Sequence, residues 1–329
     1  MTDYAVLIIA PTLLSQRDIL VDNGPARDSI SLRVLRSTMP SRLPLFSMFL
    51  LLFASVLSDA QTATCTNWAF FNQRIANSFH GAHGINRWGT VVGNTSYVGK
   101  VPYPAFVRYS NGSLKTYLAP NASSTVFTGR NAQGVTVGYY TDNTSSSHTH
   151  GLVVSGSSMV TVNYPGAADT FLQGINYWGT IVGAYFSPGS FMEKAFVLKN
   201  GVFTPIVPFG STWNSAMGIS DKGVIVGWYY DSSQLSKFRG FTLANGVYTT
   251  VDHPKGTPGG TQLYDINSSG VIVGRYNVDF GFIYSNGIFK DVNVPNNQFS
   301  NVEGINGYGD VTGIAYGSGN SALFTARCQ

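Results

Sequence analysis

One ten-residue pattern recurs six times in this chain, and it constrains the fold more than any other feature. Its clearest copy is Gly-Ile-Asn-Tyr-Trp-Gly-Thr-Ile-Val-Gly over residues 174–183. A period of about forty residues built of short apolar runs is typical of a β-propeller, in which each repeat forms one blade. The other copies begin at Gly84, Gly129, Gly218, Asp265 and Gly304, so successive starts lie 39 to 47 residues apart.

Each repeat predicts four short strands joined by tight turns. In the third copy, the first turn is Asn176–Gly179, and Asn200-Gly201 predicts a type I′ hairpin between the third and fourth strands. The fourth strand is expected to stop at Pro208, which cannot donate to a sheet. Gly183 leaves room for a neighbouring backbone or ring, and the aromatic residue two positions later is expected in the core between blades. That aromatic recurs as Tyr140, Tyr185, Tyr229 and Tyr276.

These features predict an all-β fold, a six-bladed β-propeller of four-stranded repeats of about 45 residues. The sixth repeat ends at Gln329 without its fourth strand, and residues 66–71 supply a strand-like segment at the other end. We expect Trp68 to Phe70 to pair beside Ala322 to Phe324 and close the ring in the last blade. Cys65 and Cys328 then lie where other blades have a hairpin turn, which predicts a disulfide between them.

The repeat pattern resembles the extracellular HAF-repeat family, secreted bacterial proteins that carry a similar Gly-Ile-Asn motif followed by a short Ala-Phe or Gly-Phe strand. The resemblance covers Gly84 to Arg327 and implies a secreted repeat protein without a defined activity. Where the family motif has His before this strand, only His150 matches it in this chain. The other repeats have Pro104, Lys194, Arg239, Phe280 and Ser321 there.

The chain is expected to divide into three parts. Residues 39–60 resemble a signal peptide, with Arg42 before a 15-residue apolar run and small residues before Gln61. Residues 1–38 are interpreted as an N-terminal extension from a start codon placed too early, and residues 61–329 as a single propeller domain. We expect a secreted, extracellular or periplasmic protein with no stable membrane span after cleavage. A retained anchor is the alternative, although the run is shorter than the roughly 20 residues that a span needs.

Composition and charge narrow the function classes. Charged residues make up 11% of the chain and the net charge of +4 is not gathered in a basic run, so nucleic-acid binding is not expected. His148 and His150 stand two apart on one extended segment, but no third ligand is near in sequence, and we expect solvated loop histidines and no metal. No cofactor motif is present. We expect a monomer.

Three acidic residues, Asp221, Asp265 and Glu303, lie near the repeat turns. A glycosidase needs two carboxylates about 5 to 10 Å apart. The sequence shows no such pairing, and Asp221 is expected to cap its own turn. Three turns carry an aromatic ring at one equivalent position, namely Trp88, Trp178 and Tyr308. Exposed rings there suit stacking on sugars or a partner, but we expect each ring to fold over its own blade.

The alternation of strand directions puts the variable loops on the face opposite these turns, and loops on a rigid scaffold often bind ligands. Our first hypothesis is therefore a secreted, non-catalytic binding module for a glycan or a surface protein. Its predicted anchors, loop rings without a packing role, are Phe191 and Trp213, with Tyr230 and His150 at the edges. The alternatives are a hydrolase or lyase acting at the central channel, which carboxylates and histidines around the axis would favour, and a purely structural extracellular protein.

Overall fold

The computed structural model describes residues 61–71, 81–95, 101–233, 237–257, 259–317 and 320–329. All of these lie in one compact unit, Ser55–Gln329, and the extension and signal segment predicted over residues 1–60 lie outside them. In this part of the chain, no helix is both long enough and apolar enough to cross a membrane. The only helical element that the structure describes is the short 3-10 turn η1 (Pro208–Gly210).

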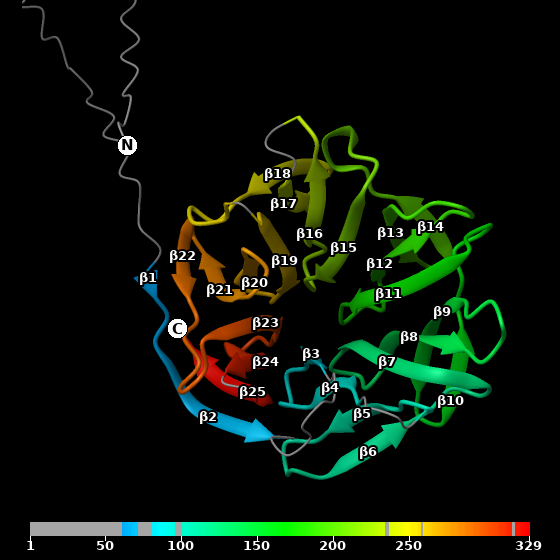
Figure 1. Ribbon diagram of the computed structural model, residues 1–329, viewed down its shortest axis with the longest axis horizontal. Helices are drawn as coiled ribbons and strands as arrows, with labels where there is room; N and C mark the ends of the chain where they lie inside the picture. Colours follow the sequence, from blue (N-terminus) through cyan, green and yellow to red (C-terminus); the bar gives the residue numbers. More distant parts are fainter. Residues whose placement is uncertain (1–60, 72–80, 96–100, 234–236, 258, 318–319) are drawn as a thin grey trace, which may run out of the picture. The chain divides into compact units, whose positions relative to one another are not determined.

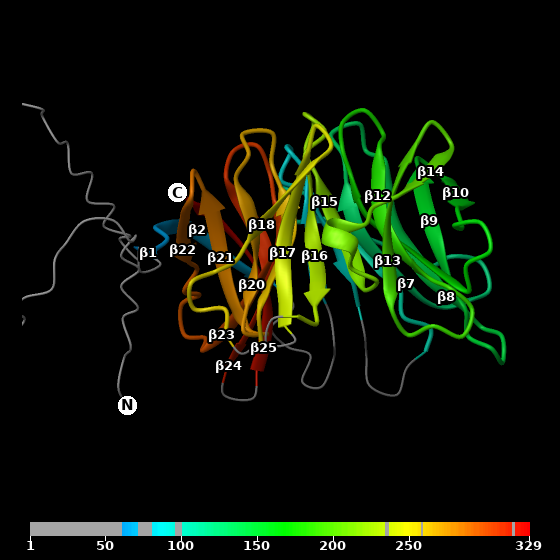
Figure 2. The ribbon, with the colours of Figure 1, turned by 90° about the horizontal axis from the view of Figure 1, so that it is seen from above.

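Four repeats form separate four-stranded antiparallel sheets, as predicted from the turn spacing (Figure 1). In each of them the strands pair in chain order, from an inner strand at the ring axis to an outer strand at the rim. Seen from the side, the strands run between two opposite faces of the ring (Figure 2). The strands are β3 (Gly81–Ile85), β4 (Val91–Asn94), β5 (Ala105–Arg108) and β6 (Leu114–Tyr117); β7 (Ala122–Arg130), β8 (Thr136–Asp142), β9 (Thr149–Ser155) and β10 (Ser158–Thr161); β11 (Asp169–Ile175), β12 (Ile181–Phe186), β13 (Glu193–Lys199) and β14 (Val202–Pro205); and β15 (Asn214–Ile219), β16 (Ile225–Asp231), β17 (Lys237–Ala244) and β18 (Val247–Val251).

The last two repeats are joined into one nine-stranded sheet, which the sequence did not predict. It contains two four-stranded antiparallel runs, β19 to β22 and β23-β24-β25-β2, linked by one parallel bridge between Phe280 and Ser300. The ninth strand, β1, pairs in parallel with β22 at the rim. The bounds are β19 (Thr261–Ile266), β20 (Ile272–Tyr276), β21 (Phe280–Ser285), β22 (Ile288–Asp291), β23 (Phe299–Ile305), β24 (Asp310–Gly317), β25 (Asn320–Cys328), β1 (Gln61–Thr62) and β2 (Cys65–Phe71).

The predicted closure of the ring by the N-terminal strand is confirmed. Strand β2 pairs antiparallel with β25, with Phe70 opposite Phe324. Cys65 and Cys328 are partners in this register, and they form the predicted disulfide with their Cα atoms 4.1 Å apart. The ring of Trp68 packs against Phe324 with a centroid distance of 5.5 Å, so the two ends of the chain are joined by backbone pairing, ring packing and a covalent bond.

The core lies between neighbouring sheets, and glycines allow close packing of strands and rings within each sheet. A Cβ atom on Gly183 would lie 2.1 Å from the carbonyl oxygen of Phe171 and 3.0 Å from the ring of Phe196, which confirms the predicted close approach. The aromatic residues two positions beyond these glycines pack into the inter-sheet clusters, also as predicted. The clusters are therefore built in the same way around the ring.

Candidate functional site

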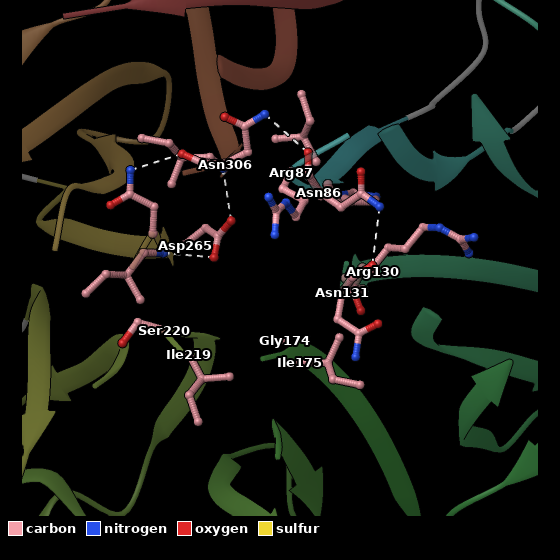
Figure 3. A pocket seen from close by; sticks show the side chains of 18 of the residues that line it. Asn86, Arg87, Arg130, Asn131, Gly174, Ile175, Ile219, Ser220, Asp265 and Asn306 are labelled. Carbon is pink, nitrogen blue, oxygen red and sulfur yellow. Dashed lines mark hydrogen bonds between the residues drawn. The ribbon is translucent and has the colours of Figure 1, made fainter. Parts of the chain in front are cut away.

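The central channel contains a cavity at the face that carries the turns between inner and second strands. It has a volume of about 560 Å³ and is lined by all six inner strands, β3, β7, β11, β15, β19 and β23, and by the turns that follow them (Figure 3). Small-molecule sites typically have volumes of about 300 to 1,000 Å³. The channel is thus large enough for a ligand of small-molecule size.

A β-bulge at the same position in every inner strand supplies the inward-facing side chains. In β3 the register skips from Ala82 to Gly84, so His83 is the extra residue. Bulges of this kind re-aim a side chain, and they are common beside functional sites. All six bulge residues line the cavity, and each is a different amino acid: His83, Thr128, Gln173, Met217, Tyr264 and Glu303. One repeated backbone feature therefore presents six chemically different groups to a ligand.

The residue after the bulge is glycine in five of the six repeats, because neighbouring inner strands touch there. A Cβ atom on Gly84 would lie 2.7 Å from the carbonyl oxygen of Thr128 and 3.2 Å from the Cα atom of Gly129. The exception is Asp265, whose Cα atom lies 2.8 Å from a Cβ built on Gly218. A carboxyl group thus occupies a position at which the other repeats have no side chain.

The carboxyl group of Asp265 is held by two backbone amides. Its Oδ1 accepts from the N–H of Ile266 at 2.8 Å, and its Oδ2 accepts from the N–H of Ile305 in the next inner strand at 2.9 Å. Burial in the channel wall raises the pKa of this carboxyl group to about 7, although the two amide hydrogen bonds oppose that shift. Figure 3 shows Asp265 turned toward the cavity. The shift favours the protonated form of this carboxyl group.

His83 and Glu303 form an ionisable pair across the junction between the first and last repeats. His83 Nδ1 contacts Glu303 Oε2, and His83 Nε2 lies 2.9 Å from Asn94 Oδ1. That amide oxygen also accepts from the backbone N–H of Gly81 at 3.1 Å, which defines it as an acceptor, so His83 Nε2 must donate. A proton then lies between His83 Nδ1 and Glu303. Burial alone would lower the pKa of His83, but the charge and hydrogen bond of Glu303, with help from Asn94, raise it.

Two tyrosines of the channel wall also have shifted pKa values. Burial and the nearby carboxylates of Glu303 and Glu193 raise the pKa of Tyr139 to about 12, so its hydroxyl stays protonated. Burial likewise raises the pKa of Tyr264, whose hydroxyl donates to Gln262 Oε1 at 3.2 Å. Both phenols therefore act as neutral hydrogen-bonding groups in the channel wall.

A chain of asparagine amides circles the mouth of the channel. The Nδ2 of Asn86 donates to the carbonyl oxygen of Asn131 at 3.3 Å, and each asparagine of the motif repeats this contact with the next turn. The contact from Asn306 to Asn86 at 3.2 Å joins the turn of the last repeat to that of the first. The series is interrupted at the fourth repeat, which has Ser220 in place of asparagine.

Asp221 bridges this interruption, which corrects the prediction that it caps its own turn. Its Oδ1 accepts from the backbone N–H of Tyr177 in the preceding repeat at 2.8 Å. Its Oδ2 accepts from the hydroxyl of Ser268 in the following repeat at 2.8 Å. The carboxylate therefore ties three consecutive turns together at the mouth.

The three aromatic turn residues stay exposed, so the prediction that each folds over its own blade is wrong. Trp88, Trp178 and Tyr308 are 60%, 74% and 60% exposed. Both indoles point to the next turn instead: Trp88 Nε1 donates to the carbonyl oxygen of Ala132 at 3.0 Å, and Trp178 Nε1 donates to that of Asp221 at 3.1 Å. This one hydrogen bond fixes the indole orientation while most of the ring surface remains in water.

The loop-face residues predicted as ligand anchors do not form one group. Phe191 is 92% exposed, as expected of a ring with no packing role. Trp213 is half-buried in an aromatic cluster with Tyr230, Phe238 and Trp228, at centroid distances of 5.1, 5.2 and 6.2 Å. The assumption that Trp213 lacks a packing role is therefore wrong, and Tyr230 is its packing partner.

His150 is not a solvated loop residue either. Its Nε2 lies 3.2 Å from Asp142 Oδ2, and its Nδ1 lies 3.0 Å from Asn163 Nδ2. His148 lies near a different carboxylate, with its Nδ1 3.7 Å from Asp169 Oδ1. In the part of the chain that the structure describes, no three His, Cys, Asp or Glu side chains are placed to hold a metal ion.

A smaller hollow of about 260 Å³ lies among residues at the loop-face ends of β17 and β20. Lys237, Phe238 and Arg275 line it, and Phe238 also packs against Trp213. None of the four predicted anchors lines this hollow. The sequence prediction thus found exposed and packed rings on the loop face but not the principal cavity.

His83 is the channel residue that sequence reasoning missed. The signal that was available is its position: His83 directly precedes the first copy of the motif, as Glu303 directly precedes the sixth. Since the last repeat of a closed ring is next to the first, these two residues were predictable neighbours. Asp265 and Glu303 were noted in the sequence, but their common cavity was not.

No protein-family model matches the sequence, and no curated protein matches it. Among solved structures, a gluconolactonase from Xanthomonas campestris matches with a TM-score of 0.47 and 12% identity, over 83% of this chain and 99% of that one. The Aleuria aurantia lectin in complex with α-methyl-L-fucoside matches with a TM-score of 0.46 and 13% identity, over 77% and 92%. AofleA from Arthrobotrys oligospora gives 0.38 and 13%, over 71% and 90%. At these TM-scores the likenesses carry no argument about function.

Proposed function

We propose that this protein binds a carbohydrate, and that the ligand enters the central channel from the face that carries Trp88, Trp178 and Tyr308. The observation that carries the proposal is the combination of one principal cavity of about 560 Å³ with three exposed rings on the turns around its mouth. Sugars present apolar C–H faces and polar edges. Exposed aromatic rings suit the faces, and a hydrogen-bonding channel suits the edges.

The fixed orientation of the indoles supports this assignment. Because Trp88 and Trp178 each donate one hydrogen bond to the next turn, their ring planes are already ordered before a ligand arrives. Pre-ordered side chains lose less conformational entropy on binding than free ones do. Rings that remain 60% and 74% exposed also offer a large contact area to a ligand.

We also propose a blade count, a family, a localisation and an oligomeric state for this protein. Counting the two four-stranded runs of the nine-stranded sheet as separate blades, we propose a six-bladed propeller that belongs with the HAF-repeat proteins. The disulfide supports secretion to the cell exterior or the periplasm, where such bonds persist. We propose that residues 39–60 direct this export and that the protein acts as a monomer.

The experiment is a glycan array probed with the secreted protein and three single variants. Trp88→Ala and Trp178→Ala remove rings at the channel mouth, and Phe191→Ala removes a more exposed ring on the loop face. A ring that anchors a ligand costs about 2 kcal/mol or more when truncated, which is roughly a 30-fold loss of affinity. We expect this loss for the two tryptophan variants and unchanged affinity for Phe191→Ala.

The opposite result would show that the ligand-binding site lies on the loop face. If Phe191→Ala abolishes glycan capture while both tryptophan variants bind normally, the original loop-face hypothesis is correct. If the wild-type protein captures no glycan, the carbohydrate assignment fails. Melting temperatures of all three variants should match the wild type, because none of these rings is buried.

A further inference from the structure

Carbohydrate binding does not require the ionisable side chains in the channel wall. Hydroxyl and amide groups are sufficient to hydrogen-bond a sugar, yet this channel places two carboxyl groups and an imidazole next to one another on neighbouring inner strands. His83 and Glu303 pair with each other, but Asp265 contacts only two backbone amides, and a buried carboxyl group without a charged partner costs free energy. The presence of Asp265 beside this pair in the cavity of the proposed ligand therefore suggests a role beyond binding.

We propose that the channel hydrolyses a glycosidic bond of its ligand, with Glu303 as the general base and Asp265 as the general acid. This inference rests on the proposed carbohydrate-binding function and assigns chemistry to the same site. Glycoside hydrolysis needs two carboxyl groups on either side of the scissile bond, one ionised and one protonated. The channel places two candidate carboxyl groups, Glu303 and Asp265, on the neighbouring inner strands β23 and β19.

Glu303 has the contacts that a general base requires. Its Oε2 contacts His83, and Oε1 has no hydrogen-bond partner among the described residues, which leaves this oxygen for a water molecule or a ligand hydroxyl. His83 is held in turn by Asn94, so the orientation of the whole Asn94–His83–Glu303 series is defined. His83 is a positioning residue in this scheme, because it acts through Glu303.

Asp265 has the opposite environment. No cationic side chain makes a hydrogen bond or an ion pair with it among the described residues, and only two backbone amides contact its oxygens. Burial in the channel wall favours its protonated form, so it can donate a proton to a leaving oxygen. Two carboxyl groups whose environments separate their protonation states are the expected arrangement for an acid and a base.

Asp265 contacts the strand that carries Glu303. Asp265 Oδ2 accepts from the backbone N–H of Ile305 at 2.9 Å, and Glu303 is two residues earlier on the same strand. A carboxylate that acts as a general base on water, and not as a nucleophile, gives inversion of configuration. Carboxyl groups about 6.5 to 9.5 Å apart leave room for a water molecule beside the sugar, whereas about 5 Å suits a covalent intermediate.

The reaction is balanced with one water molecule. Glu303 takes a proton from the water while the water oxygen forms a bond to the anomeric carbon. The bond between this carbon and the glycosidic oxygen breaks, and the electron pair stays on that oxygen, which receives the proton of Asp265. Glu303 then loses its proton to solvent and Asp265 regains one, so that the net change is addition of water across the bond.

The test combines cleavage and binding on the same glycans. The secreted protein is incubated with the glycans of the array and with 4-nitrophenyl α- and β-glycosides, and new reducing ends are measured. We expect Glu303→Gln and Asp265→Gly each to lower kcat by about 100- to 10,000-fold while glycan capture is retained. Glycine is the natural residue at the position of Asp265 in the five other repeats, so this variant is expected to fold. The first product formed by the wild type should have inverted configuration by NMR.

Two further variants distinguish an effect on catalysis from an effect on folding or ligand binding. His83→Gln should lower kcat with KM changed less than twofold, since the base is misplaced but the ring contacts remain. Asp252→Asn is the matched control, because this carboxylate is ion-paired with Arg239 at 2.8 Å and does not line the cavity; its activity should equal the wild type. If the wild type cleaves no glycan of the set, the catalytic inference is wrong. In that case, the proposed binding function is retained if the protein captures glycans. It is also wrong if the protein captures no glycan.

Discussion

Removal of the disulfide is the sharpest test of the closure of the ring. Cys65 and Cys328 are separated by 263 residues, so the bond closes almost the entire described chain into one loop. The loop-entropy relation gives about 19 cal/mol/K for a loop of this length, which is about 5.6 kcal/mol at 25 °C. Domains of ordinary stability unfold with about 5 to 15 kcal/mol, so this single bond accounts for a large share of the total.

The perturbation is the double variant Cys65→Ala/Cys328→Ala. The backbone pairing of β2 with β25 and the packing of Trp68 on Phe324 remain in it, so we expect a folded but much less stable protein. Urea unfolding, followed by far-UV and near-UV circular dichroism, should give a free energy of unfolding lower by about 4 to 6 kcal/mol. The reduced wild-type protein is the matched control and should behave in the same way. A decrease below about 1 kcal/mol would refute the reasoning and show that pairing alone closes the ring.

Three further results are expected. The folded-state pKa of Asp265 is raised from 3.8 to about 7, so its contribution to stability is complete below pH 4 and is lost as the pH rises to 7. Between pH 4 and 8, the free energy of unfolding of the wild type should therefore fall by up to about 4 kcal/mol more than that of Asp265→Gly, as measured by urea unfolding. Trp213→Ala should lower the melting temperature by several degrees, since that ring packs against Trp228, whereas Phe191→Ala should not change it. Ser220→Asn should complete the amide ring by donating to the carbonyl oxygen of Asn267. One added hydrogen bond should raise the melting temperature by about 2 to 4 °C. An unchanged melting temperature would show that Asp221 already compensates for the missing amide.

Periodicity made the propeller predictable. Turn residues such as Asn176, Gly179 and Asn200-Gly201 act locally, and their regular spacing defined every blade without knowledge of tertiary contacts. The closing strand and the disulfide were predictable because a closed ring leaves only one place for an unpaired strand. In contrast, the pairing of β1 with β22 has no sequence signal, since it involves only two residues at an exposed edge.

The placement of the site could not be predicted in the same way. Loop length favoured the face of Phe191, because variable loops often bind ligands, and the short turns looked purely structural. Trp213 appeared free because its partners, Trp228, Tyr230 and Phe238, come from other segments that the fold brings together. Alternation in a regular strand also fails to show which residue faces the channel, since the bulge shifts the alternation by one residue.

The bulge explains how a repeated fold acquires an asymmetric site. Packing requires nearly the same residues in every blade at the core positions, so variation there is costly. A bulge residue, however, is unpaired and faces the open channel, so His83, Met217 and Glu303 can replace one another in the repeat without disturbing the sheets. Two positions vary in this way: the bulge residue, and the next residue, which is Asp265 in one repeat and glycine in the other five. The proposed acid Asp265, the proposed base Glu303 and the imidazole of His83 thus lie on three consecutive inner strands, β19, β23 and β3. The inner strands of the first and last repeats meet at this point, where His83 contacts Glu303, whereas the ring is closed at the rim by the pairing of β2 with β25 (Figure 1). Formation of the proposed site therefore depends on closure of the ring, although the two involve different strand contacts.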